Sequence, residues 1–468
     1  MKNSSAQLVS NSILSDARRQ YVRRYAIALT VALGATARSA QAQAPQPPAL
    51  TLRAVLDSVA ARYPLVLAAQ ARLRAARGSR VTAGAFGNPI FSYQDDRPST
   101  RSAPVSGIDR ERTTTVTLPL EPLYQRGSRV RRADAEVRAA TEDAVAARQR
   151  AALDATRAFY RTALAQVGVA TTRDLVVWLD TLVAYNRSRA QQGVAAEADL
   201  IRSQLERDRA AADATIQDAE LAQAKAELST FVGTSPATAG LLSIAVDERP
   251  LVLPRGVVSS ASSPPMLGVT GGATLQSQAL MGRAEVRSAR ERVAAANAGV
   301  SSEYTMIFRQ LGATFGTRQR AGATSVIAGL SLPIPLFDPN RGEIARASAE
   351  RDAATYELAA QERLVSAEVS GAYEAARLLT ERTTAMASDT SGFLARADDA
   401  RRIALGAFRE GAVPLLQVID AARAWGEARL SYYRLLYAQH HGVAALVFAE
   451  GGDLLATLPA LAPVTPNR

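Results

Sequence analysis

Few residues in this chain could carry out acid–base, nucleophilic or metal chemistry. Among 468 residues there are two histidines, His440 and His441, and no cysteine. Adjacent residues of a helix point about 100° apart, so this pair is poorly placed to hold one metal ion together. Without cysteine the chain has no thiolate nucleophile and no disulfide. We therefore expect no catalytic residue, no cofactor and no metal site, and we predict that the protein is not an enzyme.

Glycine and charge patterns argue against two further activities. Arg126-Gly127-Ser128 could hold an anion if a helix begins there. We interpret it as a strand-to-helix joint, because the sequence contains no phosphate-binding glycine loop and no nucleophile elbow. The formal net charge is +11. Arginines are interleaved with acidic residues along the expected helices, which indicates solvated faces, and no nucleic-acid-binding module is recognisable. We expect no nucleic-acid partner.

Two very long helices dominate the expected structure. From Glu343 to Arg409 the chain has 67 residues without proline and is rich in alanine, glutamate and arginine, all strong helix formers. As one uninterrupted helix this run would be about 100 Å long. A second proline-free run extends from Ser128 to Gln192. Helices of this length indicate a coiled coil, a repeat or a large assembly.

The two long runs belong to one unit that occurs twice. Pro119 and Pro333, in the Leu-Pro pairs before the runs, lie 214 residues apart, and the runs stop at Gly193 and Gly411, 218 residues apart. Each glycine separates two long helices, so we expect the tip of a helical hairpin with a left-handed glycine cap. The returning helices are predicted at Glu197 to Val232 and at Leu415 to Phe448.

The chain order follows from this repeat. Basic residues, a short apolar run and small residues ending at Ala42 or Ala44 form a secretory signal peptide, too short to cross a bilayer. Thr51 is expected to cap a helix that reaches about Ala83 and breaks at Tyr63-Pro64. In the second repeat, Ala284-Glu285-Val286 occupies the place of Pro64-Leu65-Val66. We assign residues 1–44 to the signal peptide, 45–240 to the first repeat, 241–271 to a linker, 272–450 to the second repeat and 451–468 to a poorly ordered tail.

Each repeat also contains two β-prone segments, about 88–96 and 113–120 in the first and about 306–317 and 323–333 in the second, with a short turn expected at Gly316 to Gly322. Apolar residues alternate with polar ones: Thr114, Val116, Leu118 and Leu120 share one face, as do Val326, Ala328, Leu330 and Leu332. Such alternation is typical of a transmembrane barrel strand, and also of a soluble hairpin with one buried face. Arg309 falls on the apolar face, and we expect it near the lipid headgroups.

These features together resemble the TolC-type outer-membrane factors, the exit ducts of bacterial efflux and type I secretion systems. The resemblance rests on the duplicated plan, Tyr63-Pro64-Leu65-Val66, Asn88-Pro89, the two Leu-Pro joints and the glycine tips. It implies a mainly α protein with a small β part, whose duplicated helix–strand–strand–helix unit forms long hairpins. Three subunits would build a periplasmic α-barrel and a twelve-stranded transmembrane β-barrel, each subunit giving four strands.

The resemblance also implies a function and sites. It implies a homotrimeric passive channel in the bacterial outer membrane, in contact with the lipid of that membrane. The channel would work with a periplasmic adaptor and an inner-membrane pump. Asp420, Gln417 and Phe408 match positions of the family's periplasmic gate, although glutamine replaces an acid at 417. The adaptor-docking tips would contain Gly193, Val194, Gly411 and Ala412. The alternative is a secreted periplasmic coiled-coil scaffold or adaptor without a membrane barrel.

Overall fold

The structure is a computed structural model that describes residues 49–97, 110–194, 196–245, 249–251, 270–308, 311–320, 322–332, 334–387 and 392–458. The chain divides into two units, Met1–Ala49 and Leu50–Arg468, and all the described helices and strands belong to the second. The predicted signal peptide, Arg309 and most of the predicted linker lie outside the described residues.

Helices and strands of the first repeat follow the predicted order. They are α2 (Leu52–Arg62), α3 (Pro64–Gly84), β1 (Ile90–Asp96), β2 (Glu111–Pro119), α4 (Pro122–Gln191), α5 (Glu197–Val232) and the short α6 (Pro236–Ala239). Thr51 caps α2 as predicted, because its side chain accepts a hydrogen bond from the Ala54 N–H. Tyr63 adopts an extended conformation between α2 and α3, since Pro64 disfavours a helical residue before it.

The second repeat has the same plan. It consists of α8 (Thr270–Gly282), α9 (Ala284–Thr305), β3 (Gly312–Arg320), β4 (Ala323–Ser331), α10 (Arg341–Ala387), α11 (Phe393–Arg409), α12 (Leu415–Ala449) and α13 (Leu454–Thr457). Arg283 separates α8 from α9 with φ −68° and ψ 127°, and Tyr63 separates α2 from α3 with φ −67° and ψ 124°. The two breaks are therefore equivalent positions of the repeat.

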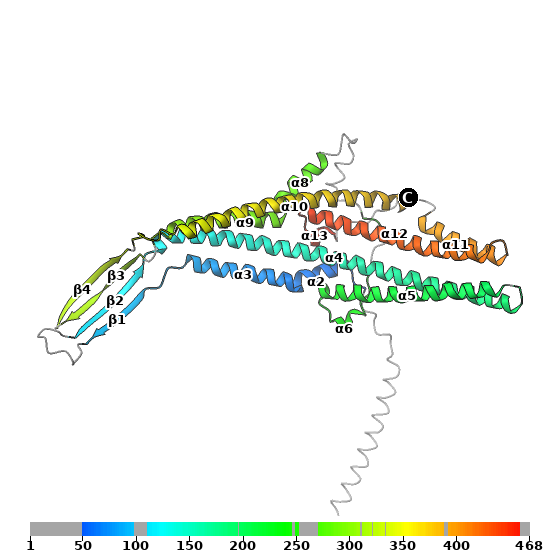
Figure 1. Ribbon diagram of the computed structural model, residues 1–468, viewed down its shortest axis with the longest axis horizontal. Coiled ribbons are helices and arrows are strands. Elements are labelled where there is room, and N and C mark those ends of the chain that lie inside the picture. Colours follow the sequence, from blue (N-terminus) through cyan, green and yellow to red (C-terminus); the bar gives the residue numbers. More distant parts are fainter. Residues whose placement is uncertain are drawn as a thin grey trace, which may run out of the picture. The chain divides into compact units, whose positions relative to one another are not determined.

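The four strands form one antiparallel sheet in the order β1-β2-β3-β4. The hairpins of the two repeats meet where β2 pairs with β3, and the backbone N–H of Leu120 continues this pairing by donating to Leu311. In Figure 1 the strands lie past one end of the long helices, and the α4–α5 and α11–α12 turns lie at the other. Helix α4 has 70 residues and so extends about 105 Å from the sheet to its tip.

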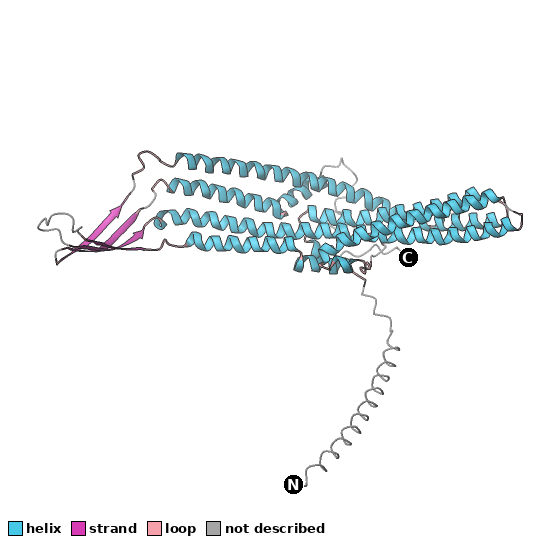
Figure 2. Cartoon of the chain, turned by 60° about the horizontal axis from the view of Figure 1, so that its bottom comes forward, coloured by secondary structure: helices cyan, strands magenta, loops and turns pink. Residues whose placement is uncertain are grey.

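Small residues let α4 pack closely against other helices along its length, chiefly α3, α5, α9 and α12. Half of its buried positions are alanine or threonine, and Figure 2 shows the long helices lying side by side. Where α2, α4, α5 and α12 meet, larger side chains fill the core, among them Val59, Phe159, Leu228 and Leu436. Among the described residues, none of the helices combines the length and apolar character that crossing a membrane requires.

The structure corrects two predicted helix boundaries. The run from Glu343 to Arg409 is not one helix, because α10 ends at Ala387 and α11 begins at Phe393 after Gly392, whose φ is +60°. The serine, aspartate and threonine residues just before Gly392 are poorer helix formers than the alanine-rich sequence around them. Arg126-Gly127-Ser128 is not a joint before a helix, because α4 already begins at Pro122. Proline is well tolerated at a first helical position.

The strand and tail predictions of the second repeat need correction as well. β3 spans Gly312–Arg320 rather than about 306–317, because α9 continues to Thr305. Gly316 lies within β3, and the pairing of β3 with β4 continues as far as Arg320 and Ala323. The turn is therefore shorter than the predicted span from Gly316 to Gly322 and lies at its C-terminal end. The described part of the tail is ordered: Asp453 caps α13, and Leu454 is fully buried. The rest of the tail, 459–468, lies outside the described residues.

Candidate functional site

One face of the sheet is apolar across all four strands. We call a row of residues paired across the strands a rung. One rung consists of Phe91, Val116, Phe315 and Ala328, and the next rung on this face contains Leu118, Ala313 and Leu330. Directly paired residues of antiparallel strands point to the same face. The predicted match in apolar parity between the two repeats is therefore confirmed, and these side chains are largely exposed, with Val326 at 84% and Leu330 at 70%.

The opposite face of the sheet is polar. Thr117 and Thr314 face each other there, with their hydroxyl oxygens 3.0 Å apart, and Ser92 and Thr115 belong to the same face. Towards the hairpin ends this face carries the ion pair of Arg318 with Glu111, at 2.9 Å. A sheet with one largely exposed apolar face and one mainly polar face suits a wall between lipid and water.

Both predicted tips have the expected geometry. Gly193 and Gly411 have φ of +70° and +78°, in the left-handed region that favours glycine. At each tip the residue after the glycine donates its N–H across six residues: Val194 to Arg189, at 2.9 Å, and Ala412 to Ala407, at 2.8 Å. This is the Schellman arrangement, which satisfies carbonyl groups at the end of a helix. Val194 is 63% exposed and available to a partner.

Behind the tips, a tip core joins the two hairpins. We define it as the buried cluster of Leu179 and Leu182 from α4, Ala210 from α5, Phe408 from α11, and Leu415, Val418 and Ile419 from α12. Phe408 is 6% exposed and meets the ring of Tyr185 edge to face, with the ring centroids 5.9 Å apart. The structure therefore places Phe408 within the packing of one subunit.

The two other predicted gate residues lie on the surface of α12. Asp420 and Gln417 are exposed, whereas Val418 and Ile419 between them are buried in the tip core. Positions three apart share a helix face, so the structure brings Asp420 and Gln417 together and separates them from Phe408. The nearest cation to Asp420 is Arg423, at 4.0 Å.

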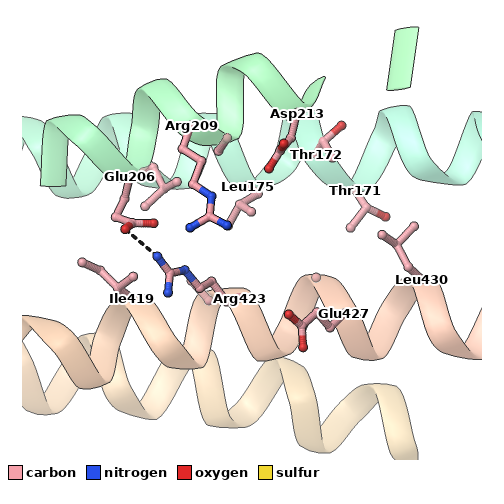
Figure 3. A pocket seen from close by; sticks show the side chains of 14 residues that line it. Thr171, Thr172, Leu175, Glu206, Arg209, Asp213, Ile419, Arg423, Glu427 and Leu430 are labelled. Atoms are coloured by element: carbon pink, nitrogen blue, oxygen red, sulfur yellow. Dashed lines mark ion pairs between the residues drawn. The ribbon is translucent and has the colours of Figure 1, made fainter. Parts of the chain in front are cut away.

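Arg423 also lines a cavity between the hairpins that the sequence did not indicate (Figure 3). The cavity has a volume of about 210 Å³ and is lined by residues of α4, α5 and α12. Arg423 is bound to Glu206 of α5 at 2.5 Å, and the Glu206 side chain is only 17% exposed. This ion pair connects the first hairpin to the second. No sequence signal could have paired residues so far apart in the chain.

The histidines occupy ordinary structural positions. His440 is buried, with its Nε2 2.9 Å from the carbonyl oxygen of Arg249 and its ring edge-on to Tyr160. Burial lowers the pKa of His441, and Arg157 lowers it further, so its imidazole is neutral at pH 7. Among the described residues there is no group of three or more metal-ligating side chains.

The structure thus combines an amphipathic sheet with very long helical hairpins whose tips are capped by glycine. The chain matches the family described as "Outer membrane efflux protein" over residues 275–452, nearly all of the second repeat. No curated protein matches the chain.

Solved structures share the fold over both repeats. The outer-membrane channel OprN aligns with 86% of this chain and 90% of its own, at 19% identity and a TM-score of 0.69. The outer membrane protein VceC from Vibrio cholerae aligns with 86% of this chain and 96% of its own, at 19% identity and a TM-score of 0.68. The CmeC outer membrane channel of Campylobacter jejuni aligns with 86% of this chain and 85% of its own, at 14% identity and a TM-score of 0.69.

The family match and the shared fold confirm the resemblance to TolC-type outer-membrane factors. The second repeat is similar to the outer membrane efflux protein family, and both repeats share the fold of these outer-membrane channels. The alternative of a secreted scaffold without a membrane part receives no support from these matches, all of which are outer-membrane proteins.

Proposed function

We propose that this protein is the passive exit duct of a tripartite efflux or type I secretion system and works as a homotrimer. The observation that carries the proposal is the sheet: four strands share an apolar face, and among the described residues β1 and β4 each have only one neighbouring strand. An open edge leaves backbone N–H and C=O groups unpaired, which hydrocarbon does not tolerate. Pairing β4 of one copy with β1 of the next closes twelve strands into a barrel.

The adaptor and the pump dock at the other end of the helices. Gly193, Val194, Gly411 and Ala412 lie where each hairpin reverses, about 105 Å from the sheet by the length of α4. A periplasmic adaptor that meets these tips would connect the duct to an inner-membrane pump. Because Val194 is exposed and its main-chain N–H already bonds Arg189, a change of its side chain leaves the cap intact.

Asp420 acts at the periplasmic mouth. Three subunits would each contribute one Asp420 and one Gln417 from the exposed face of α12, and a ring of three carboxylates would narrow the mouth and favour cations. Arg423 lies within reach of both Asp420 and Glu206, so the acid ring is coupled to the contact between the hairpins. Opening would be a shift of the hairpins between packed states, with Glu206–Arg423 opposing it.

The trimer is tested by purifying the protein in detergent and measuring its mass by native mass spectrometry, followed by single-channel recording in planar bilayers. A conducting trimer is expected, and a monomer that remains soluble without detergent would refute the proposal. For docking, a photo-crosslinking amino acid at Val194 should capture a periplasmic adaptor in cells, whereas the same probe at Tyr356, exposed in the middle of α10, should not. Equal capture at both positions would refute tip docking.

The gate is tested by Asp420→Ala, which should raise single-channel conductance. Asp208→Ala is the matched control, because Asp208 is another exposed carboxylate near the tips but lies on α5 and pairs with Arg207. Unchanged conductance in Asp420→Ala, or an equal rise in the control, would remove Asp420 from the gate.

A further inference from the structure

The apolar face of the sheet gives way to polar residues towards its hairpin end. Along β2 the outward positions are Leu118, Val116 and Thr114, and the next one is Arg112. The register pairs Arg112 with Asp95 on β1 and with Gln319 on β3. The face therefore changes over two rungs: the rung of Thr114 also contains Tyr93 and Thr317, and the rung of Arg112, about 20 Å along the strand from Leu118, is fully polar. This rung is at the end away from the helices, so it marks the outer-leaflet boundary of the membrane.

The polar rung carries an excess of positive charge. Asp95 accepts hydrogen bonds from Arg97, at 3.0 Å, and from Arg110, whose Nε is 2.7 Å from the carboxylate. Arg112 is exposed, and no acceptor lies within hydrogen-bond reach of it among the described residues. Two guanidinium groups therefore bind the Asp95 carboxylate, and Arg112 lies opposite Asp95 in the strand register, so these four described residues carry two net positive charges. We call these residues, Arg97, Arg110 and Arg112, the arginine collar.

Apart from Asp95, the acidic residues that the structure describes at this end of the sheet lie on its opposite face. Asp96 and Glu111 pair with each other across β1 and β2 and belong to the polar face of the sheet. There Glu111 is engaged by Arg318, and Asp96 accepts from Gln94. The guanidinium groups of Arg97 and Arg110 also keep exposed surface, 68% and 42% of their side chains. The charge of the collar is therefore directed towards the lipid side of the sheet.

We propose that the arginine collar binds the phosphate groups of the phosphorylated glycolipid in the outer leaflet. The inference rests on the membrane-embedded trimer of the proposed function. Guanidinium groups bind phosphate oxygens through paired hydrogen bonds, and the lipid chains would lie against the apolar rungs immediately below. Arg112 makes the direct contact, because no described residue occupies its donors. Arg97 and Arg110 add charge and are held in place by Asp95. A trimer would carry three such sites around its barrel.

The test compares Arg112→Gln with Arg320→Gln in the purified trimer. Arg320 is the matched control, because it is also exposed and at the hairpin end, but it lies on the opposite face, paired with Glu111. Binding of diphosphoryl lipid A, and of the same lipid after enzymatic removal of its phosphates, is measured by native mass spectrometry. We expect Arg112→Gln to weaken diphosphoryl lipid A binding about tenfold, the effect of losing one charge-assisted contact. Arg320→Gln should bind as the wild type does, and the dephosphorylated lipid should bind all three proteins equally weakly.

Three results would overturn the inference: equal losses in the two variants, no loss in Arg112→Gln, or wild-type binding that survives removal of the phosphates. Displacement of the lipid by an equal concentration of inorganic pyrophosphate would also overturn it, since the collar would then be a site for free phosphate. Single-channel recording on the same samples separates this inference from the proposed function. If Arg112→Gln conducts normally and binds lipid as well as the wild type, only the inference fails. If the wild type forms no conducting trimer, both fail.

Discussion

Truncating Phe408 tests whether this residue holds the tip together or closes the pore. Its ring is buried in the tip core, between α4, α11 and α12. Removing a buried phenylalanine side chain loses its transfer free energy and leaves a cavity, at a cost of about 3 kcal/mol at the lower end of the observed range. The edge-to-face contact with Tyr185 is lost as well. We therefore expect Phe408→Ala to loosen the contact between the hairpins at the tip.

The expected size of the effect follows from this free energy. Since 1.4 kcal/mol is a factor of ten, about 3 kcal/mol should raise the population of the locally opened tip roughly a hundredfold. Hydrogen exchange reports it directly, because the Gly411 amide is bonded to the Phe408 carbonyl at 3.0 Å and the Ala412 amide to Ala407. Protection of these two amides should fall about a hundredfold. The amide of Val59, in the core near the middle of the helices, should keep its protection.

Leu416→Ala provides the matched control. Leu416 is adjacent to the tip core but 45% exposed, so its truncation should cost less than about 1 kcal/mol and change exchange at Gly411 less than tenfold. The reasoning would be refuted if the two variants lost protection equally. It would also be refuted if Phe408→Ala raised conductance while exchange at the tip stayed as in the wild type. That result would favour the gate role that the family resemblance implies.

Three further predictions concern stability. Arg283→Met should lower the free energy of unfolding by about 2 kcal/mol, because Arg283 is buried and bound to Glu285 and Glu368. Arg290→Met is the control: Arg290 and Glu362 form an exposed pair, so this substitution should leave thermal unfolding nearly unchanged. Gly411→Ala should lower the free energy of unfolding by about 1 kcal/mol, because alanine is strained at the positive φ of this position. Gly406→Ala should instead stabilise the protein, because Gly406 lies inside α11 with open space beside it and alanine is the better helix former. Burial raises the pKa of Glu450 above its ordinary 4.5, so the native state binds its proton more tightly than the unfolded chain, and stability falls as pH rises from 4.5 through the native pKa. Glu450→Gln should thus raise the melting temperature at pH 7 and lose that advantage below pH 4.5; an equal gain at both pH values would contradict this cause.

Features with a strong local signal were predictable from the sequence. Gly193 and Gly411 were recognised as tips because a glycine between two long helical runs has one common use, the left-handed cap. The break before Pro64 and the helix from Glu197 to Val232 were also predicted correctly, since proline, threonine and glycine mark helix ends. The interruption between α10 and α11 was missed because alanine and arginine on both sides outweighed a few weak helix formers.

Contacts between distant segments were not predictable. The start of β3 depends on how far α9 continues, and the apolar sequence from Met306 to Phe308 suits a strand as well as a helix end. Phe408 matches a gate position of the family, and its burial in the tip core depends on how closely the second hairpin packs against α4. Glu206 and Arg423 belong to different repeats, and only the packing of the hairpins brings them within 2.5 Å. One sequence contains no signal for such a pair.

The pairing between the two repeats is held by a glycine as well as by hydrogen bonds. Gly316 of β3 lies opposite Thr115 of β2, and a Cβ atom at 316 would collide with the Thr114 carbonyl oxygen. β2 and β3 can approach this closely only where position 316 lacks a side chain. A slip of one residue would turn the apolar set of one hairpin to the polar face. The continuous apolar face, and with it the position of Arg112 on that face, therefore depends on the pairing of two strands that belong to different copies of the repeat.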